Sequence, residues 1–219
     1  MPDLTDNDNH LSIGERICRD FNRYIVDLVE KKRGFFLPYK INKIKLRDVG
    51  IFDRFETIFK SFNVVHGSCG KGKTTLFRSI AYAFDLEKYP KDLLLRKDSH
   101  CGNIEIEFTK RSSVNLRLNE EPVDYEEQDD DCVPLYGERS EYNIDRVKVK
   151  GLILDDAGDC LTKEKYQDFL GYLRELNQDL QIILTVRVNS DRSRCMFSTL
   201  FSDCNFIDLD SINSQERLF

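Results

Sequence analysis

The sequence has 219 residues, of which 40% are hydrophobic and 33% are charged, and its net charge is −6. This length supports one substantial hydrophobic core, and the negative charge excludes a surface that is basic throughout, as general nucleic-acid binding would favour. The sequence holds no apolar run near the roughly 20 residues that cross a bilayer, and its acidic start, MPDLTDNDNH, is unlike a secretory signal peptide.

The first part of the chain predicts a tail followed by a helix. Residues 1–10 are mostly polar, which favours a disordered tail. Apolar residues then recur at helical spacing, which predicts a helix over 11–33 that ends in a basic turn and Gly34. We group residues 11–37 as an N-terminal helical unit. This unit could dock a partner, form a dimer contact or pack on its own domain.

The remaining residues, 38–219, predict one α/β domain. Strands that alternate with helices in the second half imply a mostly parallel sheet covered on both faces, with an antiparallel portion beside it. The expected elements are a lysine-bearing strand around Ile44 and Leu46, a buried strand at 62–66, a helix at 73–85, a hairpin of 103–108 and 113–118, an apolar strand within 147–156, a helix from an N-cap at Thr162 to about 177, and strands at 181–186 and 205–210.

One loop carries a specific chemistry. GSCGKGKT, residues 67–74, matches the Walker A pattern G-x-x-x-x-G-K-[ST]. Glycines let the backbone curl so that successive amides point inward, and the following helix presents its positive end to the same place. Such a loop binds the phosphates of a nucleotide, here ATP. The residues expected to contact it are Gly67, Ser68, Cys69, Gly70, Lys71, Gly72, Lys73, Thr74 and Thr75.

Catalysis and magnesium binding would use residues from the loop and from a later strand. Lys73 is expected to reach the β- and γ-phosphates, and the Thr74 hydroxyl to bind Mg²⁺. Asp155 ends the strand in LILDD and is the second expected magnesium ligand. Asp156 is the expected general base, but it is one methylene shorter than the glutamate common at this position, which predicts slow hydrolysis. The acidic run 119–131 predicts a solvated loop, with magnesium capture as the alternative.

Other residues have weaker roles. Thr185 and Arg187 end the strand QIILTV, where they could contact the γ-phosphate or serve only the structure. Phe52 or Phe55 could stack on the base or belong to the core. Cys69 lies inside the loop, so its alkylation would block phosphate entry.

The segment INKIKLRDVGIFDRFETIFKSFNVVHGSCGKGKTTLFRSIAYAF resembles the N-terminal lobe of SMC/RecF-type ABC ATPases. LILDDAGDCLTKEKYQDFLGYLRELNQDLQIILTV is similar to that family's Walker B strand, D-loop, helix and next strand. The resemblance covers roughly residues 40–118 and 147–210. It implies a P-loop NTPase fold of ABC-ATPase type, ATP and Mg²⁺ as ligands, and work in DNA repair, chromosome handling or defence against foreign DNA.

Several parts of that family are missing. The sequence has no LSGGQ-like signature, and LYGERSEYN at 135–143 is the nearest segment. No long heptad run marks a coiled coil, and the Q-loop has no clear counterpart beyond Gln128. The resemblance implies that ATP is enclosed between two subunits, so we expect a protein partner to supply the missing part. A homodimer is a further expectation.

We therefore carry three functional hypotheses. The first is an ATP-binding, slowly hydrolysing ABC-like subunit that acts with a partner. The second is a nucleotide-dependent regulatory module with little or no turnover. The third is a P-loop small-molecule kinase, in which Arg192 and Arg194 would serve a lid.

Two further expectations concern surface and location. DNA contact would use the one concentrated set of basic residues, provided that they share a face. The seven cysteines form no CxxC pair, which disfavours zinc and disulfides and predicts reduced thiols in the cytoplasm. The basic residues are Lys31, Lys32, Arg33, Lys40, Lys43, Lys45 and Arg47.

Overall fold

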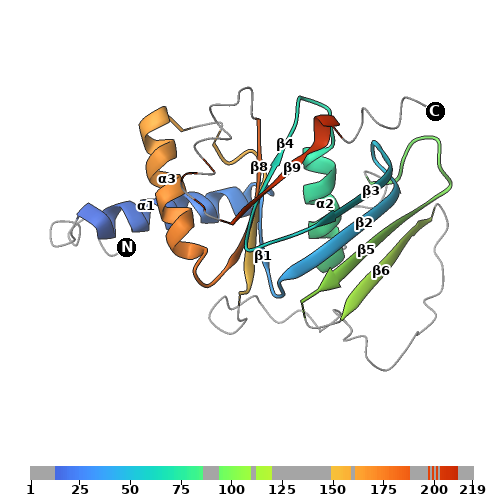
Figure 1. Cartoon of the computed structure of the whole chain (residues 1–219), viewed down its shortest axis with the longest axis horizontal. Helices are drawn as coiled ribbons and strands as arrows, with labels where there is room; N and C mark the ends of the chain where they lie inside the picture. Colours follow the sequence, from blue (N-terminus) through green and yellow to red (C-terminus); the bar gives the residue numbers. More distant parts are fainter. Residues whose placement is uncertain are drawn as a thin grey trace, which may run out of the picture.

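The computed structural model describes residues 13–85, 94–109, 112–119, 149–158, 161–187, 197, 199, 201 and 203–211. Within these residues, two sheets and three longer helices form the fold, as Figure 1 shows. Several expectations concern segments outside the described residues: the tail at 1–10, the acidic run beyond Asn119, Gln128, the segment 135–143, Arg192 and Arg194.

The larger sheet has five strands in the order β1-β7-β8-β4-β9. They are β1 (Gly34–Leu37), β4 (Phe62–His66), β7 (Gly151–Leu154), β8 (Gln181–Val186) and β9 (Cys204–Asp208). β7, β8, β4 and β9 run parallel, and β1 pairs antiparallel with β7. β4, β7 and β8 are buried at every residue, because apolar elements cover both faces of the sheet. The expected mostly parallel sheet is confirmed.

The smaller sheet is antiparallel and has the order β3-β2-β5-β6. Its strands are β2 (Ile41–Val49), β3 (Phe52–Ile58), β5 (Cys101–Phe108) and β6 (Ser113–Asn119). One face of β2 and β5 is apolar and buried, whereas the other carries charged residues in ion pairs, such as Lys43 with Glu56 and Lys45 with Glu105. The hairpin and the half-exposed lysine-bearing strand are therefore confirmed.

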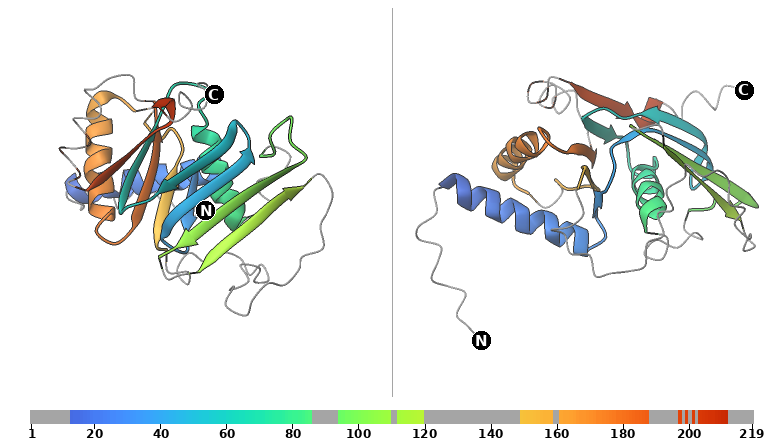
Figure 2. Two further views of the ribbon diagram at one scale, coloured as in Figure 1. Left: turned by 45° about the vertical axis from the view of Figure 1, so that its right-hand side comes forward. Right: turned by 90° about the horizontal axis from the view of Figure 1, so that it is seen from below.

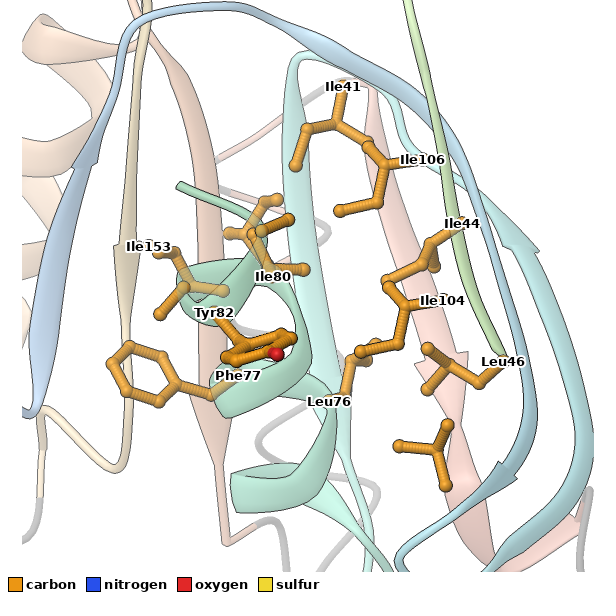
Figure 3. Packing of buried hydrophobic residues seen from close by; sticks show 14 of the residues in the cluster. Ile41, Ile44, Leu46, Leu76, Phe77, Ile80, Tyr82, Ile104, Ile106 and Ile153 are labelled. Atoms are coloured by element: carbon orange, nitrogen blue, oxygen red, sulfur yellow. The ribbon is translucent and has the colours of Figure 1, made fainter. Parts of the chain in front are cut away.

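Helix α2 (Lys73–Phe84) fills the space between the two sheets. Figure 2 shows it between them, and Figure 3 shows side chains of the antiparallel sheet directed toward it. Leu76 and Ile80 of α2 are buried in one cluster with Ile44 and Ile104 of the smaller sheet and Ile153 of the larger one. The helix that follows the Walker A loop is thus packed on both sides.

Helices α1 (Ile13–Glu30) and α3 (Lys163–Leu176) cover the opposite face of the larger sheet. Phe21 of α1 lies with its ring centroid 5.4 Å from that of Phe169 and 5.6 Å from that of Tyr172, both in α3. The side chain of Thr162 accepts a hydrogen bond from the Lys165 amide and caps α3, as expected from the sequence. α1 therefore packs on its own chain.

Residues 34–37, which we grouped with the N-terminal helix, form strand β1 instead. The helix ends before them, at Glu30, because Lys32 has a left-handed φ of 57° and the Arg33 amide donates back to the Leu28 carbonyl at 2.7 Å. Gly34 then brings the chain close to both α1 and β7. A Cβ at Gly34 would lie 3.0 Å from Val29 Cγ2 and 3.1 Å from Leu154 Cδ2. This close approach lets the next residues pair with β7, so the segment completes an edge of the larger sheet.

The buried side chain of Gln181 joins the two sheets. Its Oε1 accepts from the Ile41 amide at 2.8 Å, and its Nε2 donates to the carbonyls of Ile41 and Lys60, each at 2.8 Å. These bonds satisfy backbone groups of β2 and of the turn before β4. Among the described residues, no helix has the length and apolar character needed to cross a membrane.

Candidate functional site

The Walker A loop joins the buried strand β4 to α2, as its motif requires. Two of its glycines have left-handed backbone angles: φ is 78° at Gly70 and 96° at Gly72. A Cβ at Gly72 would overlap the Phe52 ring, with Cε2 at 2.9 Å, whereas a Cβ at Gly70 would meet nothing within 4 Å. Gly70 is therefore needed for its backbone conformation, and Gly72 for both conformation and space.

Lys73 is held inside this loop. Its side chain is buried, and its ammonium donates to the carbonyl of Gly67 at 2.6 Å and to that of Ser68 at 3.0 Å. The Lys73 ammonium therefore lies inside the curled loop, which is where a Walker A lysine binds phosphate oxygens. Thr75 faces the turn between β2 and β3, since a Cβ at Gly50 would lie 2.5 Å from Thr75 Cγ2.

The first half of the loop is bound to Asp210, just after β9. The Ser68 amide and hydroxyl both donate to Asp210 Oδ2, at 2.9 and 3.1 Å, and Lys71 Nζ lies 4.0 Å from Asp210 Oδ1. Cys69 is exposed beside them. The sequence does not predict a role for Asp210. It predicts a strand up to this residue, but only the strand pairing places that strand next to β4, with its end at the same edge of the sheet.

Thr74 and Asp155 meet, as the magnesium hypothesis requires. The Thr74 hydroxyl donates to Asp155 Oδ2 at 3.1 Å, although the residues are 81 positions apart in sequence. The strand that Asp155 follows is not the neighbour of β4, because β8 lies between β7 and β4. Thr185, at the end of β8, fills the gap and donates its hydroxyl to Asp155 Oδ1 at 2.6 Å. Asp155, only 7% exposed, thus accepts from two hydroxyls.

Asp156 occupies a strained position. Its φ is 48°, in the left-handed region that few residues other than glycine adopt, although aspartate does so more readily than most. Its amide donates to the carbonyl of Thr185 at 3.2 Å and to the hydroxyl at 3.0 Å. Its carboxylate lies 3.4 Å from the guanidinium of Arg187, and Arg33 binds its carbonyl. The expected base is therefore close to the expected metal ligand and paired with a cation.

The donor set fits a magnesium ion that is shared with phosphates. Among the described residues, no group of three or more His, Cys, Asp or Glu side chains could hold a metal by itself. Magnesium at nucleotide sites needs only one or two carboxylates, since phosphates and water supply the other ligands. The Thr74 hydroxyl and the Asp155 carboxylate, in contact with each other, match that requirement.

The structure gives other expected residues a different environment. Phe52 and Phe55 are buried, with ring centroids 4.7 Å apart, so both belong to the core and neither offers a face to a base. This corrects the stacking hypothesis. Several of the basic residues already have partners: Lys31 pairs with Asp27, Arg33 donates to the Asp156 carbonyl, and the lysines of β2 pair with glutamates.

Comparison with known proteins gives distant similarities of fold. The SMC head domain from Thermotoga maritima matches with 10% identity and a TM-score of 0.47, over 76% of this chain and 94% of that one. The recombination mediator protein RecF of the RecFOR pathway matches as RecF-ATPrS, with 12% identity and a TM-score of 0.30, over 37% and 27% of the two chains. RecF-ATP matches with 10% identity and a TM-score of 0.30, over 41% and 29%. No family model and no curated protein matches the sequence.

The chain spans less than a third of each RecF chain and most of the SMC head. At these identities and TM-scores the site is defined by its own geometry. Its defining observation is that a glycine loop, a buried lysine, a threonine and a buried aspartate from a distant strand converge at one edge of a parallel sheet.

Proposed function

We propose that this protein is an ATP-binding, slowly hydrolysing ABC-like ATPase subunit that works with a protein partner. The observation that carries the proposal is the contact between Thr74 and Asp155, next to a loop that encloses Lys73. Two segments far apart in sequence, the Walker A loop with the start of α2 and the residues just after β7, supply the groups that a magnesium-nucleotide needs. A chance glycine turn would give no reason for a buried aspartate to meet the threonine that follows the lysine.

The roles follow from chemistry. Loop amides and the start of α2 bind phosphate oxygens, and Lys73 neutralises charge on the β- and γ-phosphates. Mg²⁺, held by Thr74 and Asp155, would supply further positive charge where phosphate charge develops. Asp156 takes a proton from a water whose oxygen bonds to the γ-phosphorus. The bond from that phosphorus to the ADP oxygen breaks, and ADP leaves with its electron pair.

Two observations support slow turnover. The Asp156 side chain is shorter than glutamate, and its carboxylate pairs with Arg187 at 3.4 Å. A base in contact with a cation is a weaker proton acceptor, because the cation favours its ionised form. Arg187 must exchange this contact for another anion, such as the γ-phosphate, before Asp156 can take a proton efficiently.

The same ion pair favours a second candidate function. If Arg187 keeps Asp156 engaged with nucleotide bound, the protein binds ATP without turnover and acts as a nucleotide-dependent regulatory module. Under this alternative, bound ATP stabilises one conformation of the protein. When ADP replaces ATP, the protein leaves that conformation, as in order–disorder switches.

The partner and the process are proposals that rest on the sequence resemblance. A partner would supply the signature segment that this sequence lacks, and the process would be DNA repair, chromosome handling or defence against foreign DNA. Direct DNA contact is proposed for Arg47, which is exposed on β2. Its test is affinity capture of the native complex with DNA present and absent, at low and high salt.

Calorimetry with Mg·ATP tests the proposed function directly. The intact chain should release or absorb heat on titration, and Lys73→Ala should abolish the signal while keeping the same unfolding temperature. Phosphate release is then measured for the intact chain and for Asp156→Ala. Turnover that disappears in Asp156→Ala supports the ATPase. Binding without any turnover supports the regulatory module, and no binding at all refutes both.

A further inference from the structure

The end of α1 is attached to the turn that follows β7. Arg33 Nη2 donates to the Asp156 carbonyl at 2.6 Å, and the Asp155 amide donates to the Arg33 carbonyl at 2.7 Å. The hydroxyl of Tyr24, in α1, donates to the Ala157 carbonyl. Each residue of the sequence Asp155-Asp156-Ala157 therefore bonds to α1 or to the residues just after it.

This turn needs such support because of its conformation. Asp156 has a φ of 48°, and backbone in this region persists only where the surroundings hold it from several sides. Thr185 binds the Asp156 amide from β8, and Arg33 binds the carbonyl from the segment between α1 and β1. When both flanking peptide groups are fixed, the direction of the Cα–Cβ bond is fixed too. The positions that the carboxylate can reach are then limited to rotations about its two side-chain bonds.

We propose that Arg33 is a positioning residue for hydrolysis, acting through the backbone of Asp156. This inference rests on the proposed ATPase function. Arg33 donates to the Asp156 carbonyl, and the Asp156 carboxylate lies 3.4 Å from the guanidinium of Arg187. The N-terminal helical unit, which precedes the whole Walker A segment, thereby belongs to the catalytic machinery. The basic run that follows α1 acts here through one residue.

The neighbouring lysine offers a matched control. Lys31 belongs to the same basic run, but it pairs with Asp27 one turn earlier, and the two side chains are 63% and 45% exposed. Lys31→Met removes one positive charge from the same surface without touching the turn after β7. Arg33→Met removes the same charge together with the hydrogen bond to Asp156. Arg33→Lys keeps the charge and one donor on a shorter, more flexible side chain.

The experiment compares these three full-length variants with the unaltered chain. Calorimetry gives the Kd for Mg·ATP, and phosphate release gives kcat and KM. Hydrogen exchange is followed in the peptide covering 154–158. For Arg33→Met we expect a Kd within about twofold and a kcat lowered roughly 10- to 100-fold, since a small misplacement of a reacting group costs that much. Arg33→Lys should recover part of the rate, and Lys31→Met all of it. Exchange should be faster in Arg33→Met alone.

Two results would overturn the inference. One is an Arg33→Met variant with the kcat of Lys31→Met, and the other is unchanged exchange at 154–158. Failure of the proposed function looks different, because the unaltered chain would then give no heat or no phosphate release. In that case the exchange measurement still decides whether Arg33 holds the turn. If Arg33→Met does not fold, Arg33→Lys must show the lowered kcat with an unchanged Kd.

Discussion

Replacing Thr185 by valine should destabilise the protein by about 2 kcal/mol, because the change removes a charge-assisted hydrogen bond in the core. The Thr185 hydroxyl donates to Asp155 Oδ1 at 2.6 Å, and both residues are buried. The other groups keep a partner: Asp155 still accepts from Thr74, and the Asp156 amide still donates to the Thr185 carbonyl at 3.2 Å. The hydroxyl also accepts from the Asp156 amide at 3.0 Å, but that amide keeps the Thr185 carbonyl as a partner. The main loss is therefore the bond to the aspartate, which in this charged class contributes roughly 1.5–3 kcal/mol.

Urea unfolding of the full chain measures this loss as a shift of the midpoint at a constant slope. The same substitution made in an Asp155→Asn background supplies the control. The acceptor there is neutral, and a neutral hydrogen bond contributes only about 1 kcal/mol. We expect Thr185→Val to cost about twice as much beside the aspartate as beside the asparagine. Equal costs in the two backgrounds, or a cost below roughly 0.5 kcal/mol, would refute the role given to this hydroxyl.

Two further predictions concern the loop itself. Gly70→Ala should lower the free energy of unfolding by about 1 kcal/mol, because an alanine must adopt the left-handed backbone angle there. Gly72→Ala should lower it by at least twice as much, because the new Cβ would also overlap Phe52. Similar unfolding temperatures for the two variants would contradict this. Iodoacetamide at pH 8 should modify the exposed Cys69 well before Cys204, as measured by the masses of the labelled peptides. Burial is the larger cause and the charge of Asp203 the smaller one that raise the Cys204 pKa to about 12, so that thiol stays protonated and unreactive. Mg·ATP should protect Cys69, and labelling of Cys204 at an equal rate would be evidence against this description.

Local patterns in the sequence predicted most elements, because each pattern depends on residues close together in the chain. The Walker A loop is one continuous motif, and Asp155 stands out since a glycine and three apolar residues precede it. The N-cap of α3 and the alternation along β2 are equally local. These features need no knowledge of distant contacts, which is why the loop and the strand that carries Asp155 could be found before the structure.

The missed features all depend on distant pairs. Arg33 and Asp156 are 123 positions apart, and Ser68 and Asp210 are 142 apart. β1 reads as the end of a helical unit because its pairing with β7 is invisible in a window of a few residues. The sequence does not give the order of the strands, so it does not show that β8 lies between β7 and β4. For this reason the hydrogen bond from Thr185 to Asp155 could not be predicted.

The packing of α1 on α3 has a consequence for how the chain is made. During synthesis, the apolar stripe of α1 emerges early, whereas its cover, Lys163–Leu176, follows well over a hundred residues later. At about 5–20 residues per second, the ribosome leaves this stripe uncovered for roughly 7–30 seconds. We therefore expect chaperones that bind exposed hydrophobic helices to bind the nascent polypeptide. Stalled or truncated translation products that end before α3 should be cleared by proteases rather than accumulate.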